Sequence, residues 1–375
     1  MRDNKNLSHF ASARLTGFSP YTYGEQPKIV KGLIKLNTNE NPYPPHSGIS
    51  ADFSAHTLRY YPDPICTGLR KAAAKVLRIN NDNLIFGNGS DEILTLIFRA
   101  FFNPSTRVIM TEYTYSAYTS WANIYGIRIV TIPMRNSFTI NLARLPKQKG
   151  VFFLSNPNSP TGTAIPRAEI EKAVKKRRDV FFVIDEAYAD FAPDNCMELI
   201  KKYNNVIIVR TLSKAYSFCG GRLGFACAAP EIIRTLDLIR DSYNVNIFTQ
   251  HTAESIFRNI GYYRRNIKKI IYTREKFIRR LSELGFTTCA SHANFVFTRP
   301  PDDSAEKYFF FLRAHNIHVR FFNKPVLCGY LRISIGTDAQ MDAVITALQE
   351  CRSALKSAVK KTTTKNHINK KGSLA

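Results

Sequence analysis

The sequence has few of the features that mark secreted, metal-binding or membrane-spanning proteins. Its seven cysteines form no CxxC pair, and no histidines accompany them at metal-site spacing. An odd number also leaves one thiol unpaired if the others were bridged. No run of about 18 apolar residues occurs, and residues 1–30 contain no apolar stretch of signal-peptide length. We therefore predict a protein of the reducing cytoplasm, with no metal and no membrane partner.

Acidic residues are also scarce, since 29 Asp and Glu stand against 53 Lys and Arg and give a formal net charge of +24. Such an excess favours phosphorylated ligands or nucleic acid. Part of it lies in residues 352–375, which contain seven basic and no acidic residues, and another part in a helix-like block at 258–280. No nucleic-acid-binding motif accompanies either block. Solvated charge is therefore the favoured interpretation, and a basic nucleic-acid-binding protein is the alternative.

What the sequence does contain is the pattern of a parallel α/β sheet. Hydrophobic residues make up 44% of its 375 residues, enough for a large core. Between residues 84 and 228, short β-rich runs alternate with segments of helical period. The apolar runs at 151–154 and 181–184 are typical of strands that are buried on both faces. The predicted strands are 107–111, 127–132, 151–155, 180–184, 206–210 and 223–228, and the predicted helices are 64–78, 90–102, 116–125, 166–178 and 230–241.

Beyond residue 256 the pattern changes to a long basic helix, short strands near 294–298 and 330–335, and a last helix from residue 338. This change predicts a second, smaller domain. The predicted division is an N-terminal arm with part of the small domain at 1–45, a large domain at 46–255, a small α+β domain at 256–355 and a basic disordered tail at 356–375.

Four polar segments follow buried strands, where ligands bind in open α/β sheets. The Gly-Asn-Gly-Ser turn at 87–90 opens a helix and predicts an anion site, although a plain helix cap would look the same. The Asn- and Pro-rich segment at 156–162 fits a simple turn or a ligand loop. Asp185 ends a buried strand, so we expect either a cationic partner for its carboxylate or a role as a helix N-cap.

Lys214 stands in the fourth segment, just after a buried strand. Partial burial there would free its amine to form a Schiff base with an aldehyde. Ser213 and Arg222 offer a hydroxyl and a guanidinium to a phosphate. A Schiff-base lysine, an anion cup and a carboxylate for a pyridinium nitrogen are together the groups that bind pyridoxal 5'-phosphate.

Eight motifs in order along the chain lie at 20–27, 36–43, 61–64, 87–92, 156–162, 185–188, 211–214 and 331–337. Together they resemble the motifs of histidinol-phosphate aminotransferases, which are fold-type I enzymes that use pyridoxal phosphate. The Asn-Glu-Asn-Pro and Tyr-Pro-Asp-Pro stretches narrow the resemblance to this family. It implies a large domain with a mostly parallel seven-stranded sheet in an α/β/α sandwich, a smaller α+β domain, and a homodimer.

The resemblance also implies a role for each matching residue. Lys214 would carry the cofactor and shuttle protons, Asp185 would pair with the pyridinium nitrogen, and Tyr188 would contact the phenolic oxygen. The other implied cofactor-binding residues are Ser90, Asp91, Tyr115, Asn158, Ser159, Ser213, Arg222 and, from the neighbouring subunit, Tyr61. The residues implied for the substrate are Arg332 for its carboxylate and Arg320 and Tyr21 for its phosphate.

One departure from the family concerns Ser159, because many relatives have an Asn there that contacts the phenolic oxygen. Ser159, Asn158 or Tyr188 alone would take that contact in this chain. The reaction implied is the conversion of imidazole-acetol phosphate and glutamate to L-histidinol phosphate and 2-oxoglutarate, in histidine biosynthesis. Threonine-phosphate decarboxylase and aromatic amino-acid aminotransferase are alternatives of the same fold, which differ in the substrate pocket.

Overall fold

The computed structural model describes residues 21, 24–48, 58–103, 105–135 and 137–371. The chain forms two compact units. The first unit contains residues 1–23, 40–269 and 289–294, and the second contains 24–39, 270–288 and 295–375. The sequence places the start of the small domain near residue 256, whereas this division falls inside helix α7 (Ile260–Glu283), so that α7 contributes to both units.

A seven-stranded sheet forms the centre of the first unit, with the order β2-β8-β7-β6-β5-β3-β4. Its strands are β2 (Leu84–Asn88), β3 (Arg107–Thr111), β4 (Arg128–Ile132), β5 (Gly150–Ser155), β6 (Val180–Asp185), β7 (Val206–Thr211) and β8 (Leu223–Ala228). Strand β8 is antiparallel to both of its neighbours, β2 and β7, and the other neighbouring strands of this sheet pair in parallel. The predicted mostly parallel sheet is confirmed. Six strands agree with the predicted ranges to within one residue, and β2 is the strand that the predicted ranges leave out.

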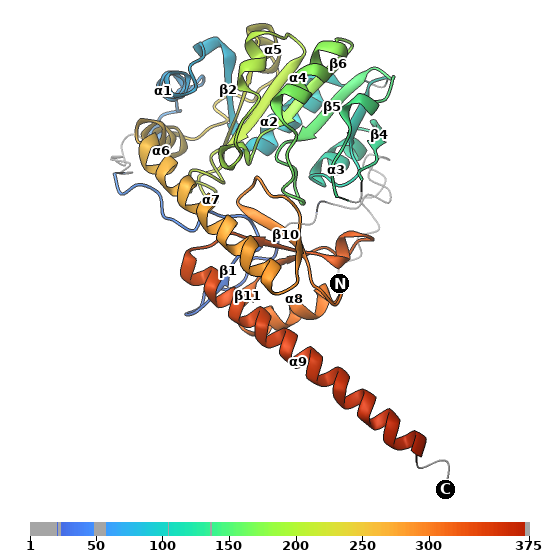
Figure 1. Cartoon of the computed structure of the whole chain (residues 1–375). Coiled ribbons are helices and arrows are strands. Elements are labelled where there is room, and N and C mark those ends of the chain that lie inside the picture. Colours follow the sequence, from blue (N-terminus) through green and yellow to red (C-terminus); the bar gives the residue numbers. More distant parts are fainter. Residues whose placement is uncertain (1–20, 22–23, 49–57, 104, 136, 372–375) are drawn as a thin grey trace, which may run out of the picture. The chain divides into compact units, whose positions relative to one another are not determined.

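Helices pack on this sheet (Figure 1). They are α1 (Thr67–Leu77), α2 (Ser90–Phe101), α3 (Ala117–Ile124), α4 (Arg167–Lys176), α5 (Pro230–Asp237) and α6 (Ile247–Arg258). In α2, apolar residues recur at helical spacing, which gives the helix one apolar side. Ile93 and Ile97 on that side share a buried cluster with Val108 of β3 and Val209 of β7. The burial of this cluster fixes the start of α2 against the sheet.

The parallel register brings the carboxyl ends of three neighbouring strands to one edge of the sheet. Ser155 at the end of β5 lies opposite Asp185 at the end of β6, and Asp185 lies opposite Val209 of β7. All three strands are buried along nearly their whole length. Polar residues that follow these strands are therefore gathered at one edge, as in other open α/β sheets.

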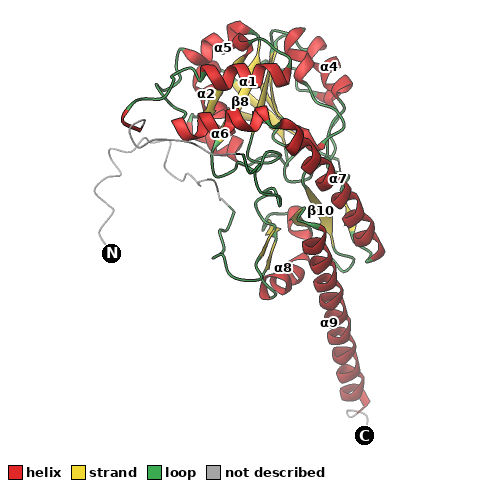
Figure 2. Ribbon diagram, turned by 90° about the vertical axis from the view of Figure 1, so that its left-hand side faces the viewer, coloured by secondary structure: helices red, strands yellow, loops and turns green. Residues whose placement is uncertain are grey.

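The second unit combines two small sheets with helices (Figure 2). Its antiparallel sheet has the order β12-β13-β10-β9, and a parallel pair joins β1 to β11. The strands are β1 (Ile34–Lys35), β9 (Thr287–Thr288), β10 (Phe295–Arg299), β11 (Ile317–His318), β12 (Arg320–Phe321) and β13 (Leu331–Ser334). Helix α8 (Ala305–Ala314) packs against α9 (Asp338–Lys371). The mixture of helices and mainly antiparallel strands is the α+β arrangement that the sequence predicts.

Helix α9 differs from the predicted end of the chain. It continues to Lys371, through most of the segment that the sequence predicts as a disordered tail at 356–375. The reason lies in composition, because residues 338–371 contain no Gly or Pro and include many Ala and Lys, which favour helix. Residues 372–375 lie outside the described residues, as do residues 1–20 of the predicted N-terminal arm.

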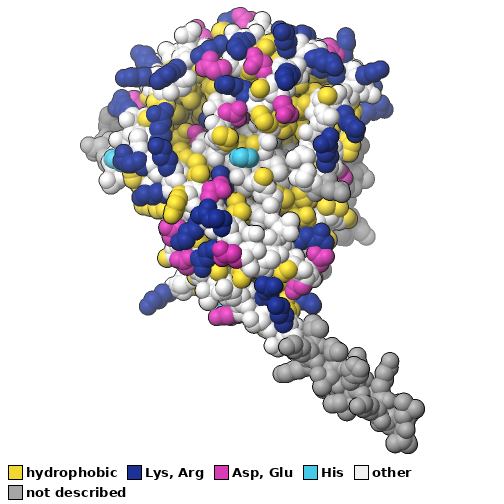
Figure 3. All heavy atoms as spheres, in the orientation of Figure 1, with side chains coloured by type: hydrophobic (Ala, Val, Ile, Leu, Met, Phe, Trp, Pro, Cys, Tyr) yellow, Lys and Arg dark blue, Asp and Glu magenta, His cyan; other side chains and the backbone are white. Residues whose placement is uncertain are grey.

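Within the described ranges, no helix is long and apolar enough to cross a membrane. The same residues contain no group of three or more His, Cys, Asp or Glu that could hold a metal ion. Figure 3 shows Lys and Arg side chains spread over the visible face and mixed with Asp, Glu and apolar side chains. On this face the charge excess is dispersed, which fits solvated charge better than one nucleic-acid-binding patch.

Candidate functional site

A tight turn between β2 and α2 forms one wall of the candidate site in the first unit. Helix α2 begins at Ser90, directly after Gly89, which has a φ of 84°. A Cβ atom at Gly89 would lie 2.5 Å from Nη2 of Arg222, and one at Gly224 would lie 2.2 Å from the backbone nitrogen of Ser90. Only glycines allow such close approach here. They bring a guanidinium to the start of a helix, whose backbone N–H groups attract anions.

Two more side chains complete this anion cup. The Thr211 hydroxyl donates to Oγ of Ser213 at 2.9 Å, and Nη1 of Arg222 donates to the same Oγ at 3.5 Å. Nη2 of Arg222 lies 3.6 Å from Oδ2 of Asp91. A hydroxyl, a guanidinium and a helix start thus converge, which is a donor set suited to a phosphate. The predicted residues Ser90, Asp91, Ser213 and Arg222 are all brought together here.

Asp185 ends β6 and is only 5% exposed. Its Oδ2 accepts a hydrogen bond from the Tyr118 hydroxyl at 2.6 Å, and its Oδ1 accepts one from the Ala187 backbone N–H at 3.1 Å. Burial raises the pKa of this carboxyl to about 6, although both hydrogen bonds act to lower it. Both donors, a phenol hydroxyl and a backbone N–H, are neutral groups. Neither is the cationic partner that the sequence predicts, and a ligand cation such as a pyridinium nitrogen fits the position.

A chain of tyrosines leads to this carboxylate. The ring centroids of Tyr21 and Tyr115 are 5.6 Å apart, and those of Tyr115 and Tyr118 are 5.5 Å apart, both with edge contacts. The Tyr115 hydroxyl also donates to Oδ1 of Asp91 at 3.3 Å. Burial raises the pKa of Tyr115 and of Tyr118, so both hydroxyls stay protonated. Sequence reasoning missed Tyr118, and its only signal was its position three residues after Tyr115.

Lys214 follows β7, next to the end of β6. Its Nζ lies 6.0 Å from the ring centroid of Tyr188, which is 7% exposed. Because β6 and β7 are neighbouring parallel strands, the segments that follow them, which contain Tyr188 and Lys214, begin at the same edge of the sheet. Nδ2 of Asn41 donates to the backbone oxygens of Lys214 and Ala215 at 3.3 and 3.0 Å. Asn41 belongs to the Asn-Glu-Asn-Pro motif, but sequence reasoning did not foresee that it holds the lysine segment.

The loop after β5 contains the predicted residues Asn158 and Ser159, both buried. The amide of Asn158 donates to the Tyr113 backbone oxygen and to Thr161 Oγ1, both at 2.9 Å. An Asn amide has two N–H hydrogens, so neither remains for a cofactor oxygen. This geometry disfavours Asn158 as the contact to the phenolic oxygen and leaves Ser159 and Tyr188 as the candidates.

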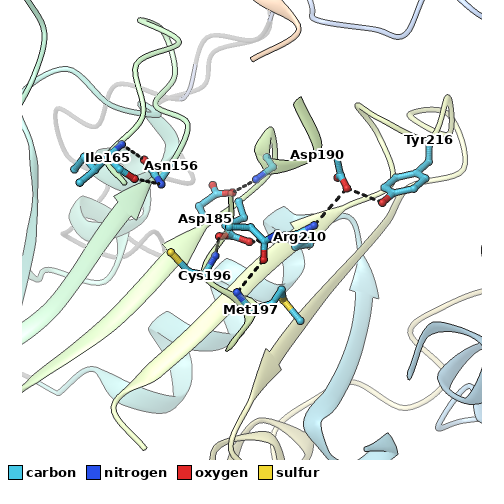
Figure 4. Close-up of polar contacts among 11 residues, drawn as sticks. Asn156, Ile165, Asp185, Asp190, Cys196, Met197, Arg210 and Tyr216 are labelled. Carbon is cyan, nitrogen blue, oxygen red and sulfur yellow. Dashed lines mark hydrogen bonds and ion pairs between the residues drawn. The ribbon is translucent and has the colours of Figure 1, made fainter. Parts of the chain in front are cut away.

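Asn156 fixes the same loop from its other end. Its Nδ2 donates to the backbone oxygen of Ile165 at 3.1 Å, and its Oδ1 accepts from the Ile165 backbone N–H at 2.7 Å (Figure 4). The backbone N–H of Asn156 donates to the backbone oxygen of Asp185 at 2.8 Å. The loop is thereby anchored to the end of β6.

In the second unit, the predicted substrate residues Arg320 and Arg332 lie directly opposite each other on β12 and β13. Both guanidinium groups lie 5.5 Å from the centroid of the Phe322 ring. Nη2 of Arg332 also donates to the backbone oxygen of Asn37 at 3.0 Å. Like charges directly opposite each other on a sheet repel. A bound anion would relieve that repulsion.

Two tyrosines among the predicted site residues of the first unit are exposed. Tyr61 is 80% exposed, and its ring stacks on that of Tyr243 with centroids 4.5 Å apart. Tyr21 is 39% exposed. Tyr21 contacts Tyr115 as described, whereas the ring of Tyr61 lies against that of Tyr243.

Comparison with known proteins gives the following relationships. The family model for aminotransferase class I and II matches residues 31–348. A histidinol-phosphate aminotransferase of Microcystis aeruginosa is 40% identical over 332 residues, which are 88% of this chain and 95% of that protein. The solved histidinol-phosphate aminotransferase from Sinorhizobium meliloti, in complex with pyridoxal-5'-phosphate, has a TM-score of 0.79 and 26% identity, and the match covers 86% of this chain and 91% of that one.

The fold also occurs in a protein named for another reaction. L-threonine-O-3-phosphate decarboxylase from Porphyromonas gingivalis matches with a TM-score of 0.75 and 22% identity, over 85% of this chain and 99% of that one. At this identity the likeness concerns the fold alone.

Proposed function

The chain belongs to the class I and II aminotransferase family, and we propose that it transfers an amino group from glutamate to imidazole-acetol phosphate, giving L-histidinol phosphate and 2-oxoglutarate. The observation that carries this proposal is the 40% identity to a histidinol-phosphate aminotransferase over 88% of the chain. The reaction is a step of histidine biosynthesis. We place the enzyme in the cytoplasm, where its free cysteines stay reduced.

The first unit fits pyridoxal phosphate by charge and by the kinds of donor it offers. Asp185 presents a buried carboxylate to a pyridinium nitrogen. The cup formed by the start of α2, Ser213 and Arg222 presents donors to a phosphate. Lys214 supplies the amine that binds the aldehyde carbon. When bound, the cofactor supplies a ring that takes up negative charge from the substrate carbon.

The side chains around the ring then have separate tasks. Once the substrate's amino group has displaced it from the cofactor, Lys214 Nζ would remove the proton from the substrate carbon as general base and return one as general acid. Asp185 keeps a proton on the pyridine nitrogen by charge. The Tyr188 hydroxyl would donate to the phenolic oxygen, with Ser159 as the other candidate, since the Asn158 amide is already engaged. Tyr115 stacks on the ring and keeps its plane fixed.

Arg332 and Arg320 bind the two anionic groups of the substrate. We assign Arg332 to the carboxylate of glutamate and Arg320, together with Tyr21, to the phosphate of the second substrate. Charge-assisted hydrogen bonds from guanidinium groups suit both anions. The cross-strand placement of the two arginines supports this assignment, because each bound anion offsets the repulsion between them.

The active enzyme is a homodimer in this proposal, and Tyr61 reaches the cofactor phosphate of the neighbouring subunit. The support is an exposed apolar surface near Tyr61, which is 80% exposed, together with Leu58, Tyr60 and Ile65 at 50% or more. Exposed apolar groups of this size commonly mark an interface. Size-exclusion chromatography with light scattering should give twice the chain mass of 42.6 kDa. A monomer that is fully active would contradict the proposal.

The test of the reaction is a direct comparison of substrates. Purified enzyme with pyridoxal phosphate should form glutamate from L-histidinol phosphate and 2-oxoglutarate. A glutamate dehydrogenase assay measures the glutamate that is formed. L-threonine phosphate should release no carbon dioxide, and phenylalanine should react with a much lower kcat/KM. A preference for phenylalanine would favour an aromatic aminotransferase, and release of carbon dioxide would favour a decarboxylase.

Arg320→Ala tests the assignment of the substrate phosphate. In the variant, KM for histidinol phosphate should rise, because a charged hydrogen bond is lost. The ratio of kcat/KM for histidinol phosphate to kcat/KM for phenylalanine should fall about ten-fold or more. Arg299→Ala is the matched control, since Arg299 is exposed and paired with Asp303 in the same unit. Equal losses for both substrates in Arg320→Ala would remove Arg320 from the phosphate site.

A further inference from the structure

A buried ion network lies at the ends of β6 and β7, and the proposed mechanism does not use it. It consists of Glu186, Arg210, Asp190 and Tyr216, of which Figure 4 labels the last three. Nη2 and Nε of Arg210 donate to Oε2 of Glu186 at 2.7 and 3.0 Å. Nη1 of Arg210 reaches Oδ1 of Asp190 at 3.4 Å, and the Tyr216 hydroxyl donates to the same oxygen at 2.8 Å. Asp190 therefore bridges the arginine and the tyrosine.

The network is removed from water. The side chains of Glu186, Arg210 and Asp190 are 0%, 7% and 15% exposed. Burial opposes the charged form of Arg210, but the neighbouring carboxylates outweigh it and raise its pKa. The other oxygen of Glu186 accepts a hydrogen bond from the Cys196 backbone N–H. Buried charges that are paired and hydrogen-bonded in this way hold their segments in one arrangement, since any shift would leave a charge without a partner.

The members of the network alternate along the chain with the proposed site residues. Glu186 follows Asp185 directly, and Asp190 comes two residues after Tyr188. Arg210 comes four residues before Lys214 and Tyr216 two residues after it. The network thus ties the segment 185–190 to the segment 210–216 on both sides of the lysine.

The geometry of strand β7 separates the ion network from the residues of the proposed site. Successive side chains of a strand point to opposite faces, so Arg210 and Thr211 at the end of β7 face opposite ways. Arg210 points to Glu186, whereas the hydroxyl of Thr211 contacts Ser213 of the anion cup. A side chain of the network can therefore move the backbone of the site without entering the site itself.

We propose that the Glu186–Arg210–Asp190–Tyr216 network is a positioning device, which fixes the distance and orientation of Lys214 relative to Asp185 and Tyr188. The inference rests on the proposed function, because it takes these three residues as the groups that hold the cofactor. In this proposal the network acts through the backbone of the two segments, because its side chains contact one another.

The test uses Tyr216→Phe in the holoenzyme, with Tyr203→Phe as its matched control. Both tyrosines are 8% exposed and donate to a carboxylate, Asp190 in one case and Glu171, at 3.1 Å, in the other. The measurements are the thermal unfolding temperature, kcat, and the circular dichroism induced in the absorbance band of bound pyridoxal phosphate. Induced dichroism reports how the bound ring is oriented, which a merely stabilising hydrogen bond would not change.

We expect only Tyr216→Phe to change the induced dichroism and to lower kcat, by about ten-fold, because misplaced catalytic groups are costly. KM for both substrates should change little. If Tyr216→Phe matches Tyr203→Phe in dichroism and kcat, the network is only structural and the inference is overturned. A wild-type chain with no cofactor band would overturn the proposed function, and with it this inference.

A second variant guards against simple misfolding. Arg210→Met alone would leave Glu186 buried and charged, so it is combined with Glu186→Gln, which removes this buried pair at similar volume and leaves Asp190 with its hydrogen bond from Tyr216. We expect this double variant to fold and to bind pyridoxal phosphate, but with altered induced dichroism and a kcat about ten-fold or more below wild type. Wild-type dichroism and kcat in the folded double variant would contradict the proposal.

Discussion

Two neighbouring carboxylates at the end of β6 are buried in opposite electrostatic settings. Glu186 meets the guanidinium of Arg210 at 2.7 Å and is satisfied within the protein. Asp185 is buried beside it with two neutral donors, and its pKa is raised to about 6. A carboxylate buried without a cation costs stability, so the fold keeps it only where something else gains from it. Glu186 is therefore a structural carboxylate, whereas the setting of Asp185 suits a cationic ligand.

The largest expected effect is the loss of activity on replacing Lys214, whose amine would bind the same cofactor as Asp185. Lys214→Ala should abolish turnover, with a loss of at least about a thousand-fold in kcat, because both the covalent anchor and the general base are removed. Stability should hardly change, since the network around Arg210 stays intact. Assays of both half-reactions measure this, with surface variant Lys201→Ala as control. Substantial activity in Lys214→Ala without an added primary amine would exclude the assigned role.

The second prediction separates activity from stability at Asp185. Asp185→Asn should lower kcat by about a hundred-fold or more, because the pyridine nitrogen loses the charge that keeps it protonated. The cofactor-free protein should be as stable as wild type or more so, since a buried charge is removed and the side chain keeps its shape. Stopped-flow kinetics and thermal unfolding measure the two effects. Equal and small changes in cofactor affinity and kcat would count against the assignment.

Glu186→Gln should show the stronger effect on stability. Its removal leaves Arg210 with Asp190 alone, at 3.4 Å. Breaking a buried ion pair from one side costs about 3 to 5 kcal/mol, and Asp190 should keep the loss near the lower value. Urea unfolding of the cofactor-free protein measures it. An unfolding free energy equal to that of wild type would show that the two carboxylates are not as different as their surroundings suggest.

Sequence analysis singled out Asp185, for which it predicted a cationic partner or a capping role, and it assigned no role to Glu186. Both are acidic residues after a buried strand, and the pattern alone does not show which of them meets a cation. Which one is paired depends on strand register, because Asp185 lies opposite Val209 and the next residues, Glu186 and Arg210, then meet across the strands. These two residues are 24 positions apart in sequence, and no local motif links them.

Local signals explain what was predicted and what was missed elsewhere. The strands near the site were predicted to within one residue because they are continuous apolar runs between turns. β2 was left out of the predicted strands because it has three apolar residues before Gly87 and Asn88 of the turn motif. The role of Asn41 required knowing that its segment lies beside the lysine, which is a long-range contact.

The smallest predicted effect is a pH dependence that Asp185, whose two hydrogen-bond donors are neutral, should produce. In the cofactor-free protein the pKa of Asp185 is about 6, compared with 3.8 as its ordinary value. Between these values the folded state holds a proton that the unfolded state has lost. Stability from this group is therefore full below about pH 4 and falls as the pH rises to about 6, by at most about 3 kcal/mol.

Asp185→Asn isolates this contribution, because an amide does not titrate. The difference in unfolding free energy between the variant and wild type, measured without cofactor from pH 4 to 7, should grow with pH up to about 6 and then level off. Pyridoxal phosphate should stabilise wild type more than the variant at pH 7, since a pyridinium nitrogen gives the charged carboxylate its partner. A difference that stays constant across this range would show that Asp185 is already ionised in the folded protein at pH 4, and the contrast with Glu186 would then rest on geometry alone.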